Sequence, residues 1–231
     1  MPINFDFENV NITEFGLGLD SPNRGFVFVP VDEVVQKSLV EMVSFTKTQM
    51  QDKASSMATY QPSEKYASIE YLTFSINDPL VQELKNLHES ENVPEDCSAF
   101  DNINQCFAYF VKLTDNNQQR ITAVRRSTQF KTLIKKRNRL VQYVDNTLKS
   151  LEETVFKLDN DFDFIIQNDL IHILRPSGLE FTAQLQKAIM DAVPANIASI
   201  ASEIDFVNFD SISQYAQNHG KCQGSCHPVL I

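Results

Sequence analysis

Alternation of apolar and polar positions recurs along the chain up to about residue 176 and predicts a sheet. The predicted strands are Ile12–Leu19, Gly25–Val31, Ala67–Ile76, Cys106–Leu113, Arg120–Arg126, Leu140–Val144, Phe162–Gln167 and Leu170–Leu174. Turn-forming residues separate several neighbours, among them DSPNRG, TDNNQQ and the dipeptide Asn168-Asp169. We therefore expect antiparallel hairpins at Cys106–Arg126 and Phe162–Leu174.

Apolar residues at helical spacing predict helices between and after these strands. Asp32 is expected to cap a helix that reaches about Gln51, and Asn77 or Asp78 to cap a short helix that begins at Pro79. The polar stretch Asp52–Lys65 is interpreted as a loop. Further helices are predicted at Glu180–Ala192, Ala195–Ile204 and Ser211–Asn218.

These elements indicate an α+β fold, a mixed or antiparallel sheet with packed helices and a helical C-terminal part. Residues 1–150 are interpreted as an α+β domain that carries the basic hairpin, and residues 151–231 as a hairpin followed by a helical region. A single domain is the alternative. With 42% hydrophobic and 22% charged residues, the composition is typical of a globular protein.

The sequence also predicts a cytoplasmic location. No apolar run approaches the roughly 20 residues of a membrane-spanning helix, and the first residues, MPINFDFENV, lack the features of a signal peptide. Recruitment to the inner membrane would then require a partner. In the cytoplasm, Cys97, Cys106, Cys222 and Cys226 are expected to be free thiols.

Charge is distributed unevenly along the chain. The whole chain carries a net charge of −10, which alone argues against a nucleic-acid partner. Residues 112–139, the basic segment, nevertheless contain nine Lys or Arg residues and one acid, a formal +8, so that the remaining chain is at −18. Such asymmetry indicates a specialised binding surface.

The basic segment predicts phosphate contacts with DNA. Arg120 and Arg126 share one face of the predicted strand, Arg125 lies on the other, and a second basic cluster follows. The candidate DNA-binding residues are Arg120, Arg125, Arg126, Lys131, Lys135, Lys136, Arg137 and Arg139. Two alternatives are an adaptor surface that docks an acidic protein, and a solvated face paired with the chain's own acids.

Candidate catalytic and metal-binding residues are weaker. Asp159, Asp161, Asp163 and Asp169 could bind a divalent cation in a metal-dependent nuclease, although their spacing also fits turns and strand ends. Cys222, Cys226 and His227, with His219 as a fourth ligand, would make an incomplete zinc site. His172 is interpreted as a strand residue. We therefore predict no catalytic residue, no metal and no cofactor.

Three stretches carry a resemblance to a known family. They are FAYFVKLTDNNQQRITAVRRSTQFKTLIKKRNRL (Phe107–Leu140), FKLDNDFDFIIQNDLIHILRPSGLEF (Phe156–Phe181) and the helical run down to about Tyr215. Together they resemble the KwaB-like proteins, the B component of the Kiwa anti-phage defence system. The chain departs from that family after Tyr215-Ala216, where GKCQGSCHPVLI ends it, and is interpreted as a C-terminally shortened member.

The resemblance implies a non-enzymatic, DNA-binding effector that blocks the replication and expression of phage DNA. It further implies a KwaA-like membrane protein as partner, which senses infection at the inner membrane, and self-association into a homodimer or higher oligomer. No active-site residue is implied by the family.

Overall fold

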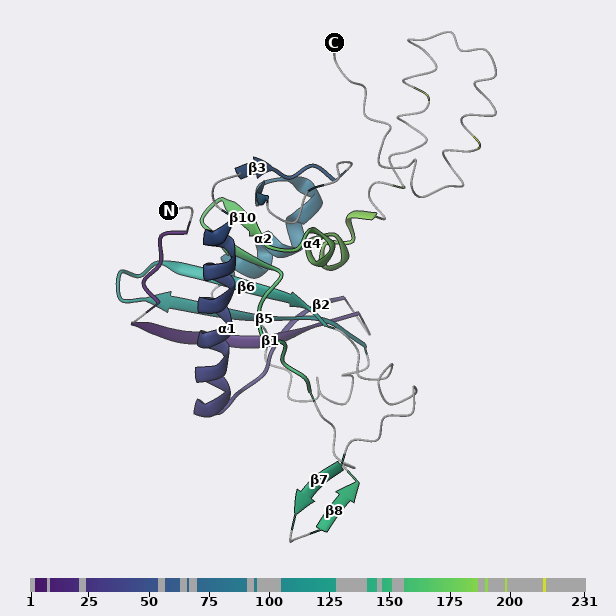
Figure 1. Cartoon of the computed structure of the whole chain (residues 1–231). Coiled ribbons are helices and arrows are strands. Elements are labelled where there is room, and N and C mark those ends of the chain that lie inside the picture. The colour runs from purple at the N-terminus through teal and green to yellow at the C-terminus, as the bar shows by residue number, and fades with distance from the viewer. Residues whose placement is uncertain are drawn as a thin grey trace.

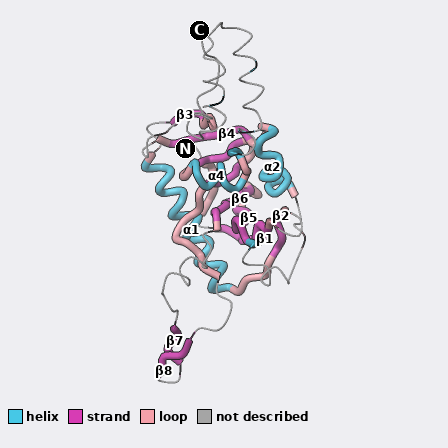
Figure 2. Tube along the Cα trace, turned by 90° about the vertical axis from the view of Figure 1, so that its right-hand side faces the viewer, coloured by secondary structure: helices cyan, strands magenta, loops and turns pink. Residues whose placement is uncertain are grey.

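A sheet of eight strands separates helix α1 from helices α2 and α4, so the body has three layers (Figures 1 and 2). The computed structural model describes residues 3–7, 9–20, 24–53, 57–62, 66, 70–90, 94, 105–127, 141–144, 147–150, 156–186, 190, 198 and 214. This arrangement confirms the predicted α+β class.

The sheet has the strand order β2-β1-β5-β6-β9-β10-β4-β3. Its strands are β1 (Val10–Leu19), β2 (Gly25–Phe28), β3 (Met57–Thr59), β4 (Tyr71–Ser75), β5 (Cys106–Asp115), β6 (Arg120–Arg126), β9 (Phe164–Gln167) and β10 (Leu170–Ile173). Neighbours are antiparallel except β3 and β4, so the sheet is mixed. The two predicted hairpins, β5–β6 and β9–β10, are confirmed.

Strand β6 pairs with β5 on one side and with β9 on the other, which brings residues from both halves of the chain into one sheet. The proposed domain boundary near residue 150 stays a prediction. A second, two-stranded sheet contains β7 (Val141–Val144) and β8 (Thr147–Ser150).

The prediction that Asp52–Lys65 is a loop is wrong at its centre. Residues Met57–Thr59 form β3, which pairs in parallel with β4. Three residues are too few for an alternating pattern to be recognised, and the partner strand lies beyond an intervening stretch of chain. Only that tertiary pairing defines β3 as a strand.

Helix α1 (Glu33–Asp52) begins where the sequence predicts. The carboxylate of Asp32 accepts a hydrogen bond from the backbone N–H of Val35 at 2.8 Å, which caps the first turn. Leu39, Val43 and Met50 follow at helical spacing and are buried against one face of the sheet. Asp78 likewise caps the short turn η1 (Pro79–Val81) that leads into α2 (Gln82–Glu89).

Apolar residues cover both faces of the sheet and form two cores. The core beneath α1 includes Leu39, Ile121 and Ala123, and the core beneath α2 and α4 includes Leu84, Val124 and Leu179. Alternate residues of β6 therefore enter opposite cores, as their spacing predicts. The middle of β6 is buried on both faces, so that basic side chains reach solvent only near its ends.

Helix α4 (Pro176–Thr182) begins four residues before the predicted start at Glu180. Pro176 occupies the first turn, where its missing N–H costs nothing. Gly178 lies inside the helix, where an added Cβ would approach Asp163 Cγ to 2.3 Å. A close tertiary contact, which the local sequence does not reveal, thus requires this glycine.

The predicted helices Ala195–Ile204 and Ser211–Asn218, and the end of the predicted helix Glu180–Ala192, lie outside the described residues but for isolated positions. Among the helices of the described part of the chain, none is long and apolar enough to cross a membrane.

Candidate nucleic-acid interface

The three arginines of β6 have different environments. Arg120 begins the strand and Arg126 ends it, and both are exposed. With a rise of about 3.3 Å per residue, they lie about 20 Å apart. Arg125 is half-buried on the α1 side of the sheet. The sequence prediction treated the three as equivalent phosphate contacts, and the structure separates them.

Three aspartates surround the guanidinium of Arg125. Its Nη1 lies 2.6 Å from Asp163 Oδ1 and 3.4 Å from Asp161 Oδ1, and its Nε lies 3.2 Å from Asp159 Oδ2. The side chain of Arg125 is 16% exposed and that of Asp163 only 4%. The prediction that Arg125 contacts a phosphate stays a prediction, and these ion pairs argue for an internal role instead.

The same aspartates bind a second arginine. Arg175, which precedes α4, forms an ion pair with Asp161 and approaches Asp163 at 3.6 Å. Burial opposes ionisation of Asp159, but Lys157 and Arg125 hold the pKa of that carboxyl below its ordinary value. At Asp163, burial raises the pKa despite the Arg126 N–H and the arginines. The cluster is thus a compact network of opposite charges.

This pairing bears on the metal hypothesis. The fourth predicted acid, Asp169, accepts a hydrogen bond from Asn77 Nδ2 at 3.3 Å and takes no part in the ion pairs of the cluster. Within the described ranges, no group of three or more His, Cys, Asp or Glu residues is arranged to hold a metal ion. The Arg125 guanidinium has a nitrogen within 3.4 Å of a carboxylate oxygen of each of Asp159, Asp161 and Asp163.

Arg126 directs its side chain away from the acidic cluster. Its backbone N–H donates to Asp163 Oδ2 at 2.8 Å, while its guanidinium carbon lies 3.9 Å from the centre of the Phe181 ring on α4. Within the described part of the chain, neither Arg126 nor Arg120 has an acidic side chain in ion-pair contact. Both residues are exposed at the ends of β6.

Lys112, the first base of the basic segment, is buried. Its ammonium group lies 2.7 Å from Glu14 Oε2 and donates to the Ser90 carbonyl at 2.9 Å. Burial lowers its pKa, and Glu14 opposes that effect. Lys112 therefore stabilises the fold between β1 and β5 and contributes no exposed charge. Lys131, Lys135, Lys136, Arg137 and Arg139 lie outside the described residues.

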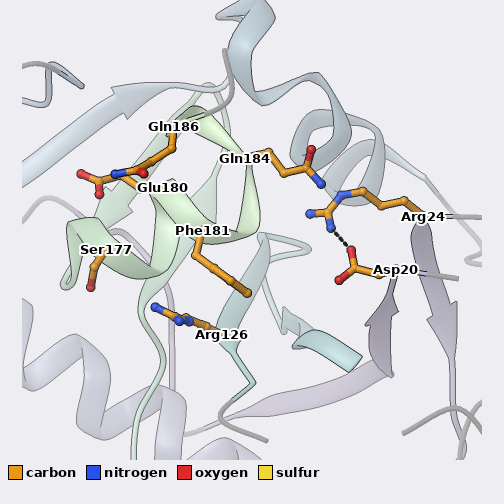
Figure 3. Close-up of a pocket in the computed structure, with 8 residues that line it drawn as sticks. All are labelled: Asp20, Arg24, Arg126, Ser177, Glu180, Phe181, Gln184 and Gln186. Atoms are coloured by element: carbon orange, nitrogen blue, oxygen red, sulfur yellow. Dashed lines mark hydrogen bonds and ion pairs between the residues drawn. The ribbon is translucent and has the colours of Figure 1, made fainter. Parts of the chain in front are cut away.

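A cavity of about 570 Å³ opens beside Arg126 (Figure 3). Arg126 and Phe181 line one side, and Asp20 and Arg24, which lie between the end of β1 and the start of β2, line the other. Arg24 forms an ion pair with Asp20 and a second one with Glu83, whose Oε2 lies 3.1 Å from Arg24 Nε. Its guanidinium carbon lies 3.6 Å from the centre of the Phe107 ring. Sequence reasoning did not identify this cavity, because its walls come from distant segments.

The other candidate residues are structural or lie elsewhere. His172 is buried on β10, as predicted, and its Nδ1 lies 2.7 Å from the Tyr71 hydroxyl. Cys106 is a buried free thiol, and burial raises its pKa to about 11. Cys97, His219, Cys222, Cys226 and His227 fall outside the described residues.

Comparisons with known proteins gave one match. The model of a family described as Kiwa protein KwaB-like matches residues 103–222. The matched region contains the β5–β6 hairpin, the acidic cluster, the β9–β10 hairpin and α4. No curated protein and no solved structure matched the chain.

Proposed function

The chain belongs to the Kiwa protein KwaB-like family, and from this premise we propose that it is a non-enzymatic, DNA-binding effector. Membership of the family gives the chain a role in Kiwa anti-phage defence. DNA as the ligand, and obstruction of phage DNA replication and expression as the mechanism, are the proposed parts. These two parts state which molecule the chain would bind and how that binding would act in defence.

The observation that carries the proposal is the concentration of positive charge in residues 112–139 of an otherwise acidic chain. Two of the nine bases, Lys112 and Arg125, are paired with internal carboxylates. Seven remain as candidates for phosphate contact, namely Arg120, Arg126, Lys131, Lys135, Lys136, Arg137 and Arg139. Because the rest of the chain is strongly acidic, this segment is where a polyanion would be attracted.

Binding through such a segment is electrostatic and tolerant of sequence. Lysine and arginine that neutralise phosphates release condensed counterions, so the affinity falls steeply with salt. Phosphate contacts position a protein on DNA without reading its bases. An effector that must act on varied phage genomes would benefit from such binding, because it does not depend on a particular recognition sequence.

Arg125 has a supporting role in this proposal. Its ion pairs with Asp159 and Asp163 join the end of β6 to the chain that enters β9. That connection fixes the backbone from which Arg126 projects. We therefore assign DNA contact to Arg126 and positioning to Arg125.

The proposed partners follow from the family. A KwaA-like membrane protein would recruit the chain to the inner membrane at the site of infection, and self-association into a dimer or higher oligomer would multiply the DNA contacts. Repetition of a weak basic surface in an oligomer would raise its effective affinity without new contacts.

The proposal is tested by charge reversal in the second basic cluster. A variant with Lys135→Glu, Lys136→Glu and Arg137→Glu should lose most of its affinity for duplex DNA at moderate salt. The matched control carries Lys37→Glu, Lys47→Glu and Lys85→Glu, which change the net charge equally outside the segment. Equal affinities of the two variants would refute the site. Cleavage of plasmid DNA with Mg²⁺ or Mn²⁺ would favour the nuclease alternative.

A further inference from the structure

We propose that the cavity beside Arg126 binds one unstacked nucleotide, with its base against Phe181 and its phosphate on Arg126. This inference rests on the proposed DNA binding and gives it a second component, recognition of an unpaired nucleotide. The nucleotide could belong to a DNA strand or be free, because a base with its phosphate has the same chemistry in both.

Phe181 is the stacking surface of the cavity. The side chain is 42% exposed at the end of α4, so part of its apolar ring is open to a ligand. The close-up shows it pointing from α4 into the space between Arg126 and the Arg24–Asp20 pair (Figure 3). Arg126 covers one face of the ring, with its guanidinium carbon 3.9 Å from the ring centre, so the proposed base stacks on the opposite face. No other ring contacts Phe181 among the described residues. Nucleobases stack on such a platform whatever their identity.

Arg126 supplies the charge for the phosphate. A guanidinium stacked on an aromatic ring uses its planar face and leaves its N–H groups directed outward in the plane. These groups can bind two phosphate oxygens at once. Because the backbone N–H of Arg126 is held by Asp163, the strand end is fixed and the side chain alone must adjust to the ligand.

The opposite wall is rigid and polar. Arg24 is held by Asp20 and Glu83 and donates to the Thr182 carbonyl at 2.6 Å. With its oxygen turned toward Arg24, the Gln184 amide accepts from Arg24 Nε at 3.0 Å. Its amide nitrogen and the Asp20 carboxylate then offer a donor and an acceptor for the polar edge of a base.

The backbone at Gln184 supports a specific role for this wall. Gln184 has φ = 53°, in the left-handed region that favours glycine or asparagine after a helix. Such strain persists where surrounding contacts determine the conformation, and it gathers at binding sites. Here the strained residue places its side chain between α4 and Arg24, at the inner wall of the cavity.

The cavity is large enough to hold one nucleotide. About 570 Å³ lies within the range typical of small-molecule sites and admits one nucleotide. A paired base would first have to leave the duplex, which costs least where the base is already unpaired. A DNA carrying an unpaired nucleotide should therefore bind more tightly than a fully paired duplex of the same length.

The test compares two short DNA duplexes of the same length, one that carries a single unpaired deoxyadenosine and one that is fully paired. The wild-type chain should prefer the first by about fivefold or more, the lower range for one stacked base. Phe181→Ala should abolish the preference while it keeps binding to the paired duplex. Phe181→Trp should keep the preference, and so should the control Phe45→Ala, which removes another exposed ring, from α1.

A second arm separates this inference from the proposed function. Saturable binding of deoxyadenosine monophosphate that is lost in Phe181→Ala would support the site even without a preference for the unpaired deoxyadenosine, with a free nucleotide as its ligand. The inference would be overturned if the wild-type chain showed neither the preference for the unpaired nucleotide nor binding of deoxyadenosine monophosphate. It would also be overturned if Phe181→Ala retained either of these two properties. If the paired duplex still bound, the proposed function would stand. Failure to bind any DNA would instead contradict the proposed function.

Discussion

The guanidinium of Arg125 lies against the carboxylate of Asp163, with Nη1 2.6 Å from Oδ1. The second oxygen of the same carboxylate accepts the backbone N–H of Arg126 at 2.8 Å. One buried aspartate therefore holds two consecutive arginines, one by its side chain and the other by its backbone. Arg125 is used inside the protein, whereas the side chain of Arg126 is exposed and lies over the ring of Phe181.

Replacement of Arg125 should destabilise the fold. Among the described cations, Arg125→Gln leaves Asp159, Asp161 and Asp163 with Lys157 and Arg175 as partners. Loss of one partner of a buried ion pair costs about 3 kcal/mol. Urea unfolding should show a lower midpoint with an unchanged slope. Arg126→Gln is the matched control, because it removes an exposed cation–π contact worth about 1 kcal/mol or less. Equal losses in the two variants would contradict the assigned roles.

The same pair of variants should differ in the opposite sense toward DNA. Arg126→Gln should weaken binding and reduce the slope of log affinity against log salt by about one, because one phosphate contact is lost. Arg125→Gln, measured where it is still folded, should leave that slope unchanged. If Arg125→Gln reduced the salt slope and Arg126→Gln did not, the phosphate contact would have to be assigned to Arg125.

Substitution of Gly178 should reverse the usual effect of alanine in a helix. Alanine normally stabilises a helix interior by about 1 kcal/mol relative to glycine. At position 178 its Cβ would lie 2.3 Å from Asp163 Cγ, so Gly178→Ala should lower the thermal midpoint and disturb the aspartate that holds Arg125. Gly25→Ala, where nothing lies within 4 Å of the added atom, should be tolerated. A stable Gly178→Ala protein would contradict the close contact.

Two buried histidines should make the fold sensitive to acid. Burial lowers the pKa of His88 and of His172 to about 4 from an ordinary 6.5. As the pH falls, these histidines are therefore protonated in the unfolded chain before they are protonated in the folded one. The folded state keeps its full stability above about pH 6.5 and loses stability as the pH falls toward 4. The loss should reach up to about 3 kcal/mol per histidine.

The measurement is the urea midpoint at several pH values between 7 and 4. His88→Asn and His172→Asn keep a polar atom near each Nδ1, which contacts Thr122 and Tyr71 respectively. The double variant should lose less stability over this range than the wild type, since carboxylates common to both proteins cancel in the comparison. Identical pH profiles would show that the histidines titrate normally.

Much of the sheet could be predicted because its signals are local. The β5–β6 hairpin joins two alternating runs across a polar turn, in which Gln118 takes φ = 60°. Asp32 and Asp78 cap their helices by contacts within three residues. The strand β3 and the early start of α4 escaped prediction, since pairing with β4 and contact with Asp163 define them.

The site was harder to predict because its partners are distant in sequence. The local sequence shows Arg125 and Arg126 as equal bases, and only the approach of Asp163 distinguishes them. The alternation of Asp159, Asp161 and Asp163 was a visible signal, but the sequence offered a metal site or turns and strand ends as its explanation and did not identify Arg125 as the partner. Nothing near Arg126 indicated Phe181 or Arg24, which the fold brings to the same cavity.

The central claim is tested most directly by the affinity of the wild-type chain for duplex DNA across a range of salt concentrations. If all seven candidate bases contact phosphates, a slope of about −0.9 per phosphate predicts a log–log slope of about −6, with binding at low salt independent of sequence. Absence of binding at low salt, or an affinity that does not change with salt, would contradict the account.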